Sequence, residues 1–157
     1  MDKNKLKTYG ISILIAEAVG IISGLISSSG MAAYDTVNKP ALTPPDFVFP
    51  IVWTILYALM GISAARILLA PQTKERNHGL IIYALQLFVN FFWSILFFNL
   101  QAFDVSFIWL LLLWALIILM IISFKKTDRV AALLQIPYLI WVTFAGYLNF
   151  MVWMLNK

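Results

Sequence analysis

Five long apolar runs, separated by short polar segments, dominate the pattern of hydrophobic and polar positions along the chain. Each run holds roughly 20 residues, and a helix of that length crosses a hydrocarbon core of about 30 Å. The runs are continuous rather than alternating, which favours helices over the strands of a membrane barrel. The pattern therefore predicts an all-α membrane protein, a five-transmembrane-helix bundle formed by a single domain over residues 1–157. The expected spans are about 9–28, 47–69, 79–98, 104–124 and 130–153.

The composition agrees with this pattern. Only 11% of the residues are charged and 62% are hydrophobic, whereas an ordinary soluble domain is about 25% charged. The first run follows Lys3, Lys5 and Lys7, as the apolar part of a signal peptide would. It is longer than the usual signal run of about 7–15 residues, and Glu17 interrupts it, so we expect a retained first helix.

Basic residues lie mainly at one end of the expected helices. Nine of them fall on or near the side of the N terminus, and only Lys39 and Lys157 fall on the other. Because basic residues favour the cytoplasmic side, we expect a multi-pass protein of the cytoplasmic membrane with a cytoplasmic N terminus and an external C terminus. The net charge of +4 then reflects this topology and anionic lipid headgroups, not nucleic-acid binding.

The residues that conventional catalysis requires are scarce. The chain has no cysteine, so a disulfide, a thiolate nucleophile and a cysteine-bound metal are all excluded. The single histidine, His78, is expected in a solvated cytoplasmic loop, and no glycine-rich phosphate-binding motif is present. The acidic residues fall mostly in loops, with no pair at helical spacing. We therefore expect no metal site, no required cofactor and no conventional enzyme.

Two features of the first run leave alternatives open. Glu17 lies inside the expected span, where an ionisable residue is a candidate for relaying a proton or holding a cationic group. It can equally be a protonated carboxyl, or one bonded to Ser12, Ser23 or a neighbouring helix. Small residues also recur every four positions, which allows close helix approach in a dimer or within the bundle. These residues are Ala16, Gly20, Gly24 and Ser28.

The segment from Tyr34 to Gly61 joins a polar loop with three prolines to the second apolar run. Proline fixes φ and restricts the residue before it, so this loop is stiff and a candidate lid. Three of the runs carry polar or aromatic residues at helical spacing, which places each set on one helix face. The three sets are Trp53, Tyr57, Met60 and Ala64; Gln86, Asn90, Trp93 and Phe97; and Trp141, Ala145 and Asn149.

The amides in these sets need partners in hydrocarbon, so Gln86, Asn90 and Asn149 should face the interior of the bundle. The indoles, with Trp109 at a similar depth, gather in the half of the bundle beneath the loop. Tryptophan and tyrosine are also common at bilayer interfaces without any ligand, but the convergence of three sets beneath one loop favours a pocket. Flat aromatic walls with a few hydrogen-bond donors suit a flat, largely apolar ligand.

Three ordered motifs carry a family resemblance. The first loop and second run read N-K-P-A-L-T-P-P-D-F-V-F-P-I-V-W-T-I-L-Y-A-L-M-G. The third run contains V-N-F-F-W-S-I-L-F-F at 89–98, and the fifth contains P-Y-L-I-W-V-T-F-A-G-Y-L-N at 137–149. Together, from about residue 20 to 149, they resemble the translocator protein family, also called the tryptophan-rich sensory or peripheral benzodiazepine receptor family (TspO/MBR).

The resemblance implies a five-helix bundle, often dimeric, that binds porphyrins such as protoporphyrin IX or a haem-like tetrapyrrole. Some members bind sterols or isoquinoline and benzodiazepine ligands. We therefore expect a porphyrin-binding receptor or carrier in the lipid bilayer that forms a homodimer. The alternatives are light-dependent porphyrin breakdown and transport of lipids or small solutes.

The sequence sets and the family motifs together give the candidate site residues. For ligand binding they are Tyr34, Trp53, Tyr57, Asn90, Trp93, Trp141, Ala145 and Asn149. Trp53 and Trp141 match the family's tryptophans associated with porphyrin breakdown, so they are the only catalytic candidates.

The chain also departs from the family pattern. Ala33 stands where the family usually has tryptophan, Leu42 replaces a loop aromatic, and Trp109 replaces an intramembrane acid of the fourth helix. The sterol motif of animal members fails near the C terminus, where Phe150 occupies the aromatic position and Lys157 is the only base. These departures predict an altered porphyrin affinity or orientation.

Overall fold

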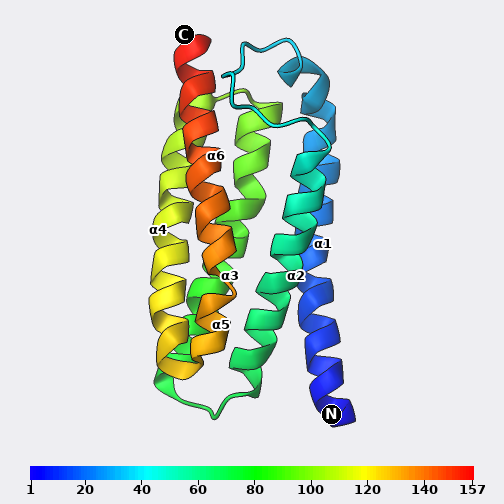
Figure 1. The fold of residues 1–157 in the computed structure, drawn as a ribbon, viewed down its shortest axis with the longest axis vertical. Helices are drawn as coiled ribbons and strands as arrows, with labels where there is room; N and C mark the ends of the chain where they lie inside the picture. Colours follow the sequence, from blue (N-terminus) through cyan, green and yellow to red (C-terminus); the bar gives the residue numbers. More distant parts are fainter.

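Seven helical segments follow one another along the chain in the computed structural model, which describes all 157 residues (Figure 1). Five helical stretches among them are long and apolar enough to cross a membrane. This confirms the predicted all-α fold class and indicates a multi-pass membrane protein. The segments are α1 (Lys3–Tyr34), α2 (Val48–Leu69), α3 (Lys74–Ser94), the π-helix η1 (Ile95–Asn99), α4 (Phe103–Thr127), α5 (Arg129–Leu133) and α6 (Ile136–Leu155).

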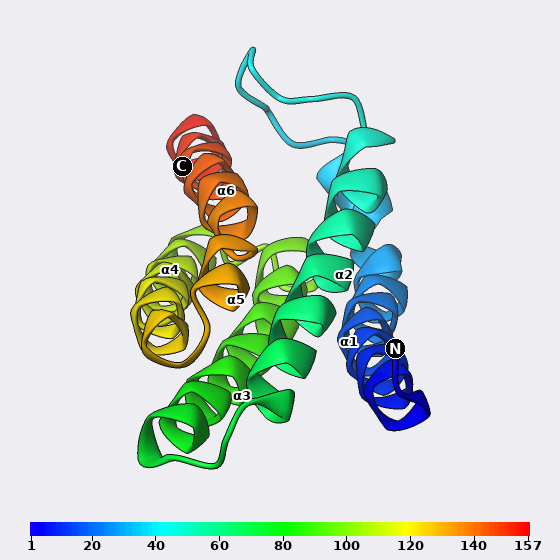
Figure 2. The ribbon, with the colours of Figure 1, turned by 60° about the horizontal axis from the view of Figure 1, so that its bottom comes forward.

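The helices run up and down between two ends of the bundle, which we call the base and the mouth (Figures 1 and 2). The base holds the N terminus, the connection 70–73 and the turn at Asp128. The mouth holds the proline-rich connection 35–47, the turn 100–102 and the C terminus. α1 packs along α2, α3 along α4, and α4 along α6.

The first helix is longer than the expected span of 9–28. Its 32 residues measure about 48 Å at 1.5 Å per residue, well beyond a hydrocarbon core of about 30 Å. The helix continues past residue 28, where the expected span ends, although serine and glycine at 27–30 are typical of a loop. In the structure these small residues allow α1 to approach η1 closely, and a Cβ on Gly30 would meet the backbone of Phe98. Tyr34, expected in the loop, is the last residue of α1.

The third helix also differs from its expected bounds. It begins at Lys74 rather than 79, since Thr73 caps it by accepting a hydrogen bond from the Arg76 N–H at 3.1 Å. His78, expected in a loop, therefore lies on α3, where its side chain is exposed. At Ile95 the geometry changes from α to π, a change that hydropathy does not reveal.

The fifth expected span, 130–153, is interrupted. α5 ends at Leu133 and α6 begins at Ile136, with Pro137 in its first turn. Proline has no N–H, and its ring clashes with the carbonyl four residues earlier, which here belongs to Leu133. Proline chemistry therefore accounts for a break that the apolar pattern does not show.

The base of the bundle is tightly packed. Met60, Ile117 and Phe124 are each 0% exposed and belong to one continuous apolar core. The hydroxyl of Ser63 donates to the Ala131 carbonyl at 2.7 Å, which joins α2 to α5. The side chain of Arg76 donates to two carbonyls at the end of α2. Side-chain hydrogen bonds thus satisfy backbone groups that the helix end leaves free.

Asp128 ties α2 to the turn between α4 and α5. Its Oδ1 accepts a hydrogen bond from the Ala131 N–H at 3.0 Å, and its Oδ2 lies 2.9 Å from Nη2 of Arg66. Partial burial raises the pKa of Asp128, but the Ala131 hydrogen bond and the Arg66 guanidinium outweigh burial and hold the pKa below its ordinary value. The carboxylate is therefore stabilised as an anion at neutral pH.

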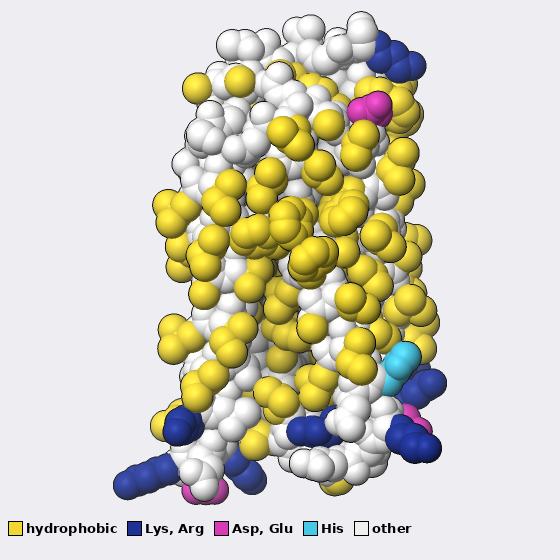
Figure 3. Space-filling model, turned by 180° about the vertical axis from the view of Figure 1, so that it is seen from behind, with side chains coloured by type: hydrophobic (Ala, Val, Ile, Leu, Met, Phe, Trp, Pro, Cys, Tyr) yellow, Lys and Arg dark blue, Asp and Glu magenta, His cyan; other side chains and the backbone are white.

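The outer surface matches a membrane environment. Figure 3 shows hydrophobic side chains over the middle of one face, with Lys and Arg gathered at the base. Large apolar side chains such as Leu14, Leu25, Ile108 and Ile140 are more than half exposed. Apolar side chains around the middle of the bundle are those that hydrocarbon accommodates.

Candidate functional site

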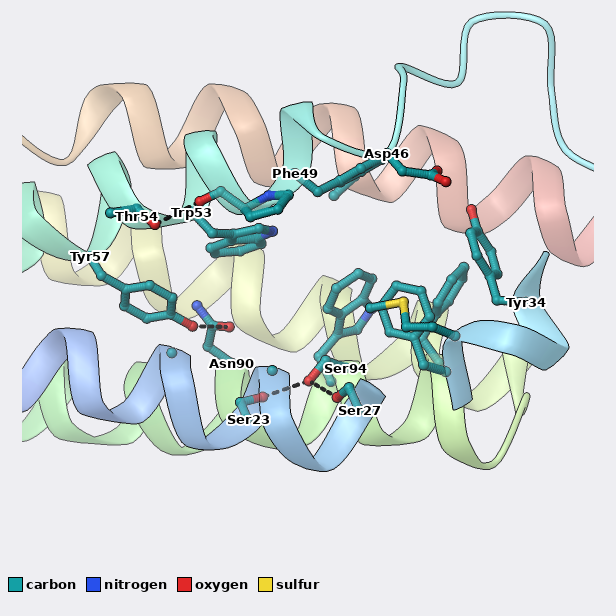
Figure 4. A pocket seen from close by; sticks show the side chains of 18 of the residues that line it. Ser23, Ser27, Tyr34, Asp46, Phe49, Trp53, Thr54, Tyr57, Asn90 and Ser94 are labelled. Atoms are coloured by element: carbon teal, nitrogen blue, oxygen red, sulfur yellow. Dashed lines mark hydrogen bonds between the residues drawn. The ribbon is translucent and has the colours of Figure 1, made fainter. Parts of the chain in front are cut away.

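A cavity of about 580 Å³ lies in the mouth half of the bundle, between α1, α2, α6 and the α3–η1 segment (Figure 4). α2 packs along α1 but makes far less backbone contact with α6, so room remains between α2 and α6. Small-molecule sites usually measure about 300–1,000 Å³ and are mostly apolar, with a few polar groups. The cavity therefore has the size of a ligand site.

The structure brings all eight predicted ligand-binding residues to this cavity. They are Tyr34 on α1, Trp53 and Tyr57 on α2, Asn90 and Trp93 on α3, and Trp141, Ala145 and Asn149 on α6. Met60, Ala64 and Gln86, from the same sequence sets, lie in the buried core instead. The sets thus mark both the cavity wall and the packed core. Ligand binding by these residues stays a prediction.

Aromatic rings from α2 and α6 form one wall. The Trp53 ring lies 5.7 Å from Tyr57 and 6.2 Å from Tyr138, and the Trp141 ring lies 5.8 Å from Phe49. Trp53 and Trp141 are only partly buried, because they line the cavity. The Nε1 of Trp141 has no hydrogen-bond partner in the chain, so ring packing alone holds this indole.

A chain of hydrogen bonds fixes the polar side chains at the inner end of the cavity. The Tyr57 hydroxyl donates to Oδ1 of Asn90 at 3.2 Å, and Nδ2 of Asn90 donates to the Tyr138 hydroxyl at 2.7 Å. The Tyr138 hydroxyl in turn donates to Oε1 of Gln86 at 2.7 Å. Since each amide in this chain is buried and partnered, the prediction that they face the interior is confirmed.

A second network surrounds Asn149. Its Oδ1 accepts hydrogen bonds from Nε1 of Trp93 at 3.0 Å and from the Ser106 hydroxyl at 3.1 Å. Its Nδ2 donates to the Phe103 carbonyl at 2.9 Å. Asn149 is fully buried, as predicted, and it sets the orientation of the Trp93 indole.

The π-helix η1 shapes the mouth end of the cavity. It places the Phe97 ring against Trp93, with centroids 5.3 Å apart and planes 24° apart, and against Tyr34 at 5.3 Å. Phe98 contacts Tyr34 edge-on at 5.1 Å. The close approach at Gly30 brings α1 near enough for these contacts. Such π-turns in α-helices are frequent at functional sites.

Three serines lock α1 onto α3 beside the cavity (Figure 4). The hydroxyls of Ser23 and Ser27 lie 2.6 and 2.8 Å from that of Ser94, and Ser23 also donates to the Phe91 carbonyl. Ser23 is therefore not a partner of Glu17, which corrects one of the expected alternatives. Glu17 forms no hydrogen bond or ion pair within the chain, and it lines the cavity.

Several lining residues were not among the predicted ones. Phe49 completes one aromatic wall, as does Phe97, which belonged to the third run's set but not to the eight candidates. Asp35 and Asp46 lie where the proline-rich loop joins α1 and α2. In Figure 4 the Asp46 carboxylate and the Tyr34 ring lie at the mouth end. Phe49 lies four residues before Trp53, so the helical spacing of that set could have identified it.

The proline-rich loop borders the cavity rather than covering it. Only its end residues Asp35 and Asp46 belong to the lining, and no residue between them does. Asn156 attaches the loop to the end of α6, since its side chain accepts from the Asn38 N–H at 3.0 Å and donates to the Asn38 carbonyl at 2.8 Å. The proline-rich loop, which was expected to be a lid, therefore runs along the rim of the cavity in this structure.

The family departures fall outside the lining. Trp109 donates from Nε1 to the Val89 carbonyl at 2.7 Å and so ties α4 to α3. Leu42 is 66% exposed, and Ala33 is exposed near the end of α1. None of the three lines the cavity, so any effect on a ligand has to be indirect.

The small residues of α1 do not form one packing face. Ala16 is buried, and Gly20 packs so closely on the Tyr57 ring that a Cβ would clash. Gly24 has open space beside it, and Ser28 is exposed. Close approach within the bundle therefore accounts for Gly20, while the homodimer stays a prediction.

Comparison with known proteins agrees with the motifs. The TspO/MBR family profile matches residues 12–154. The chain is 39% identical to the "Tryptophan-rich protein TspO" of Chlorobaculum tepidum, over 99% of both chains. It is 41% identical to "Protein CrtK" of Rhodobacter capsulatus, over 90% of this chain and 89% of that one. It is also 32% identical to the "Translocator protein" of Ovis aries, over 82% and 79%.

Proposed function

This chain belongs to the TspO/MBR family, and on that premise we propose that it binds a flat, largely apolar ligand of the porphyrin or tetrapyrrole class. The site is the mouth cavity, and the protein works as a membrane sensor or carrier. Relatives named tryptophan-rich sensory protein and translocator protein are consistent with both roles.

The convergence of indole rings on one cavity carries this proposal. Trp53, Trp93 and Trp141 come from three different helices and line the same space of about 580 Å³. Aromatic rings supply large apolar contact area and favour stacked or edge-on contacts with other rings. The amides of Asn90 and Asn149 are already held in hydrogen-bond networks. The walls are therefore preorganised, which lowers the cost of ordering them around a ligand.

A titration with protoporphyrin IX tests the proposal. The porphyrin should quench tryptophan fluorescence saturably, with a Kd in the micromolar range, equivalent to about −8 kcal/mol. Trp141→Phe and Asn149→Ala should weaken binding, the first by shrinking a wall and the second by releasing the Trp93 indole.

Trp153→Phe is the matched control. Its ring packs on Phe107 and Phe150 and does not line the cavity, so this variant should bind like the wild type. If all three variants and the wild type bind equally, the cavity is not the porphyrin site.

Light-dependent porphyrin breakdown is a second candidate, because Trp53 and Trp141 both line the cavity. Breakdown needs light and oxygen: an excited porphyrin takes an electron from an indole held against it, dioxygen accepts that electron, and the reduced oxygen species formed beside the ring oxidise it. This sequence depends on near-contact geometry. We expect no turnover in the dark. Illumination of the wild type and the Trp53→Phe/Trp141→Phe variant at equal occupancy decides between the two roles. Faster bleaching in the wild type supports breakdown, and equal bleaching supports binding alone.

Transport of lipids or small solutes is the third candidate, and the unpaired Glu17 carboxyl in the cavity lining favours it. Ionisable groups inside membrane spans often mark solute or proton pathways. Uptake into proteoliposomes measures this activity directly. Uptake that is lost in Glu17→Gln would favour transport, and an equal signal in empty liposomes would exclude it.

The orientation in the membrane is part of the proposal. Basic residues gather at the base, with only Lys39 and Lys157 at the mouth, so the base is cytoplasmic and the mouth external. The chain has no native cysteine, which suits thiol labelling. An impermeant reagent added outside should label a cysteine at Asn38 and spare one at Gln72, and the reverse pattern would overturn the orientation.

A further inference from the structure

The cavity lining carries charge of one sign only. Glu17, Asp35 and Asp46 belong to it, and no lysine, arginine or histidine does. The single ion pair of the chain, between Arg66 and Asp128, involves none of them. The three acidic residues of the lining are therefore not compensated by a basic lining residue.

These carboxylates lie at different depths. Asp35 and Asp46 flank the mouth, at the two ends of the proline-rich loop. Glu17 lies 17 residues before Tyr34 on α1, about 25 Å deeper at 1.5 Å per residue. A ligand that fills the cavity thus meets acidic groups near both ends and aromatic rings between them.

Lys39 is the one base close to the mouth. Its Nζ lies 4.6 Å from the centre of the Tyr34 ring and donates to the Asp35 carbonyl at 3.4 Å. It does not line the cavity. Even with Lys39 counted, acidic groups outnumber basic ones around the site by three to one.

Resting on the proposed function, and deepening it, we propose that the cavity selects flat aromatic ligands whose polar substituents are neutral or cationic and disfavours those that carry free carboxylates. Like charges repel, which lowers the affinity for an anion, most strongly at the half-buried Glu17 and less at the exposed Asp35 and Asp46. A cation gains from the same carboxylates and from the faces of the tryptophan and tyrosine rings. Among tetrapyrrole-like rings that enter the cavity, those with esterified, amidated or amine-bearing side chains therefore bind more tightly than the free acid.

Three probes with one ring and different charges test this selectivity. They are protoporphyrin IX, with two carboxylates; its dimethyl ester, which is neutral; and its bis-amide with a tertiary diamine, which carries two positive charges at neutral pH. The full-length protein in nanodiscs of zwitterionic lipid is titrated with each probe at low salt, and empty nanodiscs give the signal from partition into lipid.

The probes also differ in how strongly they partition into lipid, and comparison of the wild type with a variant removes this difference. The measured quantity is the ratio of the Kd for the free acid to the Kd for the ester, in the wild type and in Glu17→Gln/Asp35→Asn/Asp46→Asn. Partition into lipid cancels when the two ratios are compared, as in a double-mutant cycle. Since the mouth carboxylates are exposed and screened, we expect the ratio to fall by about three- to tenfold in the variant. The diamine probe should lose affinity in the same variant.

Lys39→Gln is the matched control, because it tests whether the mouth attracts a ligand carboxylate instead of repelling it. If Lys39 receives a ligand carboxylate, this variant loses affinity for the free acid alone. That result, or an acid-to-ester ratio equal in the wild type and the triple variant, overturns the inference while leaving porphyrin binding intact. Absence of saturable binding by all three probes overturns the proposed function itself, and this inference with it.

Discussion

The base and the mouth of the bundle use the same helices in opposite ways. At the base, side chains such as Met60, Ile117 and Phe124 are completely buried, and an ion pair and a serine–carbonyl hydrogen bond join α2 to the turn region and α5. At the mouth, Trp53 and Trp141 are partly buried around a cavity of about 580 Å³. Close packing supplies stability, and a void forfeits it. The comparison indicates that packing in the base half stabilises the fold, while the mouth half contains the candidate site.

Truncating one phenylalanine in each half gives the largest expected contrast. Phe124 is 0% exposed and stacks on Tyr83 at 6.2 Å, so Phe124→Ala should lower the free energy of unfolding by about 3–5 kcal/mol. Phe49 already lines a void, so Phe49→Ala should cost about 1 kcal/mol or less. Denaturant titration in mixed micelles measures both. Equal losses would mean that the mouth is as tightly packed as the base.

Two glycines allow helix packing to be compared between the base half and the mouth half. A Cβ on Gly61 would meet the backbone of Ile13 on α1, which cannot move aside as a side chain can. Gly61→Ala should therefore destabilise the protein by about 1–3 kcal/mol through overpacking. A Cβ on Gly24, in the mouth half, meets nothing within 4 Å. Gly24→Ala should be neutral, or stabilising by up to about 1 kcal/mol from helix propensity.

The same unfolding assay compares the two glycine variants. A loss at Gly24→Ala as large as that at Gly61→Ala would show that α1 is also closely packed at Gly24, which would contradict the open space described there.

The smallest expected change in the free energy of unfolding comes from removing the ion pair at the base. Arg66 is 33% exposed on its side chain, and such pairs contribute about 0–1 kcal/mol. Asp128→Asn keeps a residue that can cap α5 but removes the charge, so it should cost no more than this at pH 7.

The pH dependence of this effect has a definite sign. The folded-state pKa of Asp128 lies below its ordinary value. The stabilisation is therefore complete above the ordinary carboxyl pKa of about 4 and is lost as the pH falls through the folded-state pKa. Unfolding curves of the wild type and Asp128→Asn should converge in acid. A difference that persists there would assign the effect to packing rather than charge.

Of the eight candidate residues found in the cavity lining, Tyr34 was expected only from the family resemblance. Hydropathy predicted the five spanning helices, and periodicity predicted the other seven residues, because helical spacing places residues on a common face whatever the loops do. They did not predict the ends of α1 and α3. Ser27, Ser29 and Gly30 are residue types common in loops, but each contacts another helical segment, and a short polar turn begins α3. Hydropathy measures affinity for lipid, whereas these features depend on neighbours that only the fold supplies.

The acidic residues of the cavity lining show a second limit of prediction from the sequence. Glu17 stood out in the sequence as an acid inside a membrane span, but Asp35 and Asp46 are ordinary loop residues there. Only the fold brings the two ends of the loop to one rim, beside the same cavity. Asp35 and Asp46 follow no helical spacing and resemble any other exposed acidic residue, so the sequence gives no sign that they share a site.

The side-chain bonds from α2 to the helices beyond α1 begin at Tyr57 and continue to Arg66, leaving its first turns without any. A rigid-body tilt of α2 would therefore pivot near its base end and move its outer end most. From Arg66 to Val48 the helix is about 27 Å long, so a tilt of about 5° displaces the outer end by about 2 Å. The width of the cavity therefore depends on the tilt of α2, and the bonds of Ser63 and Arg66, which do not line the cavity, help to fix that tilt from the base.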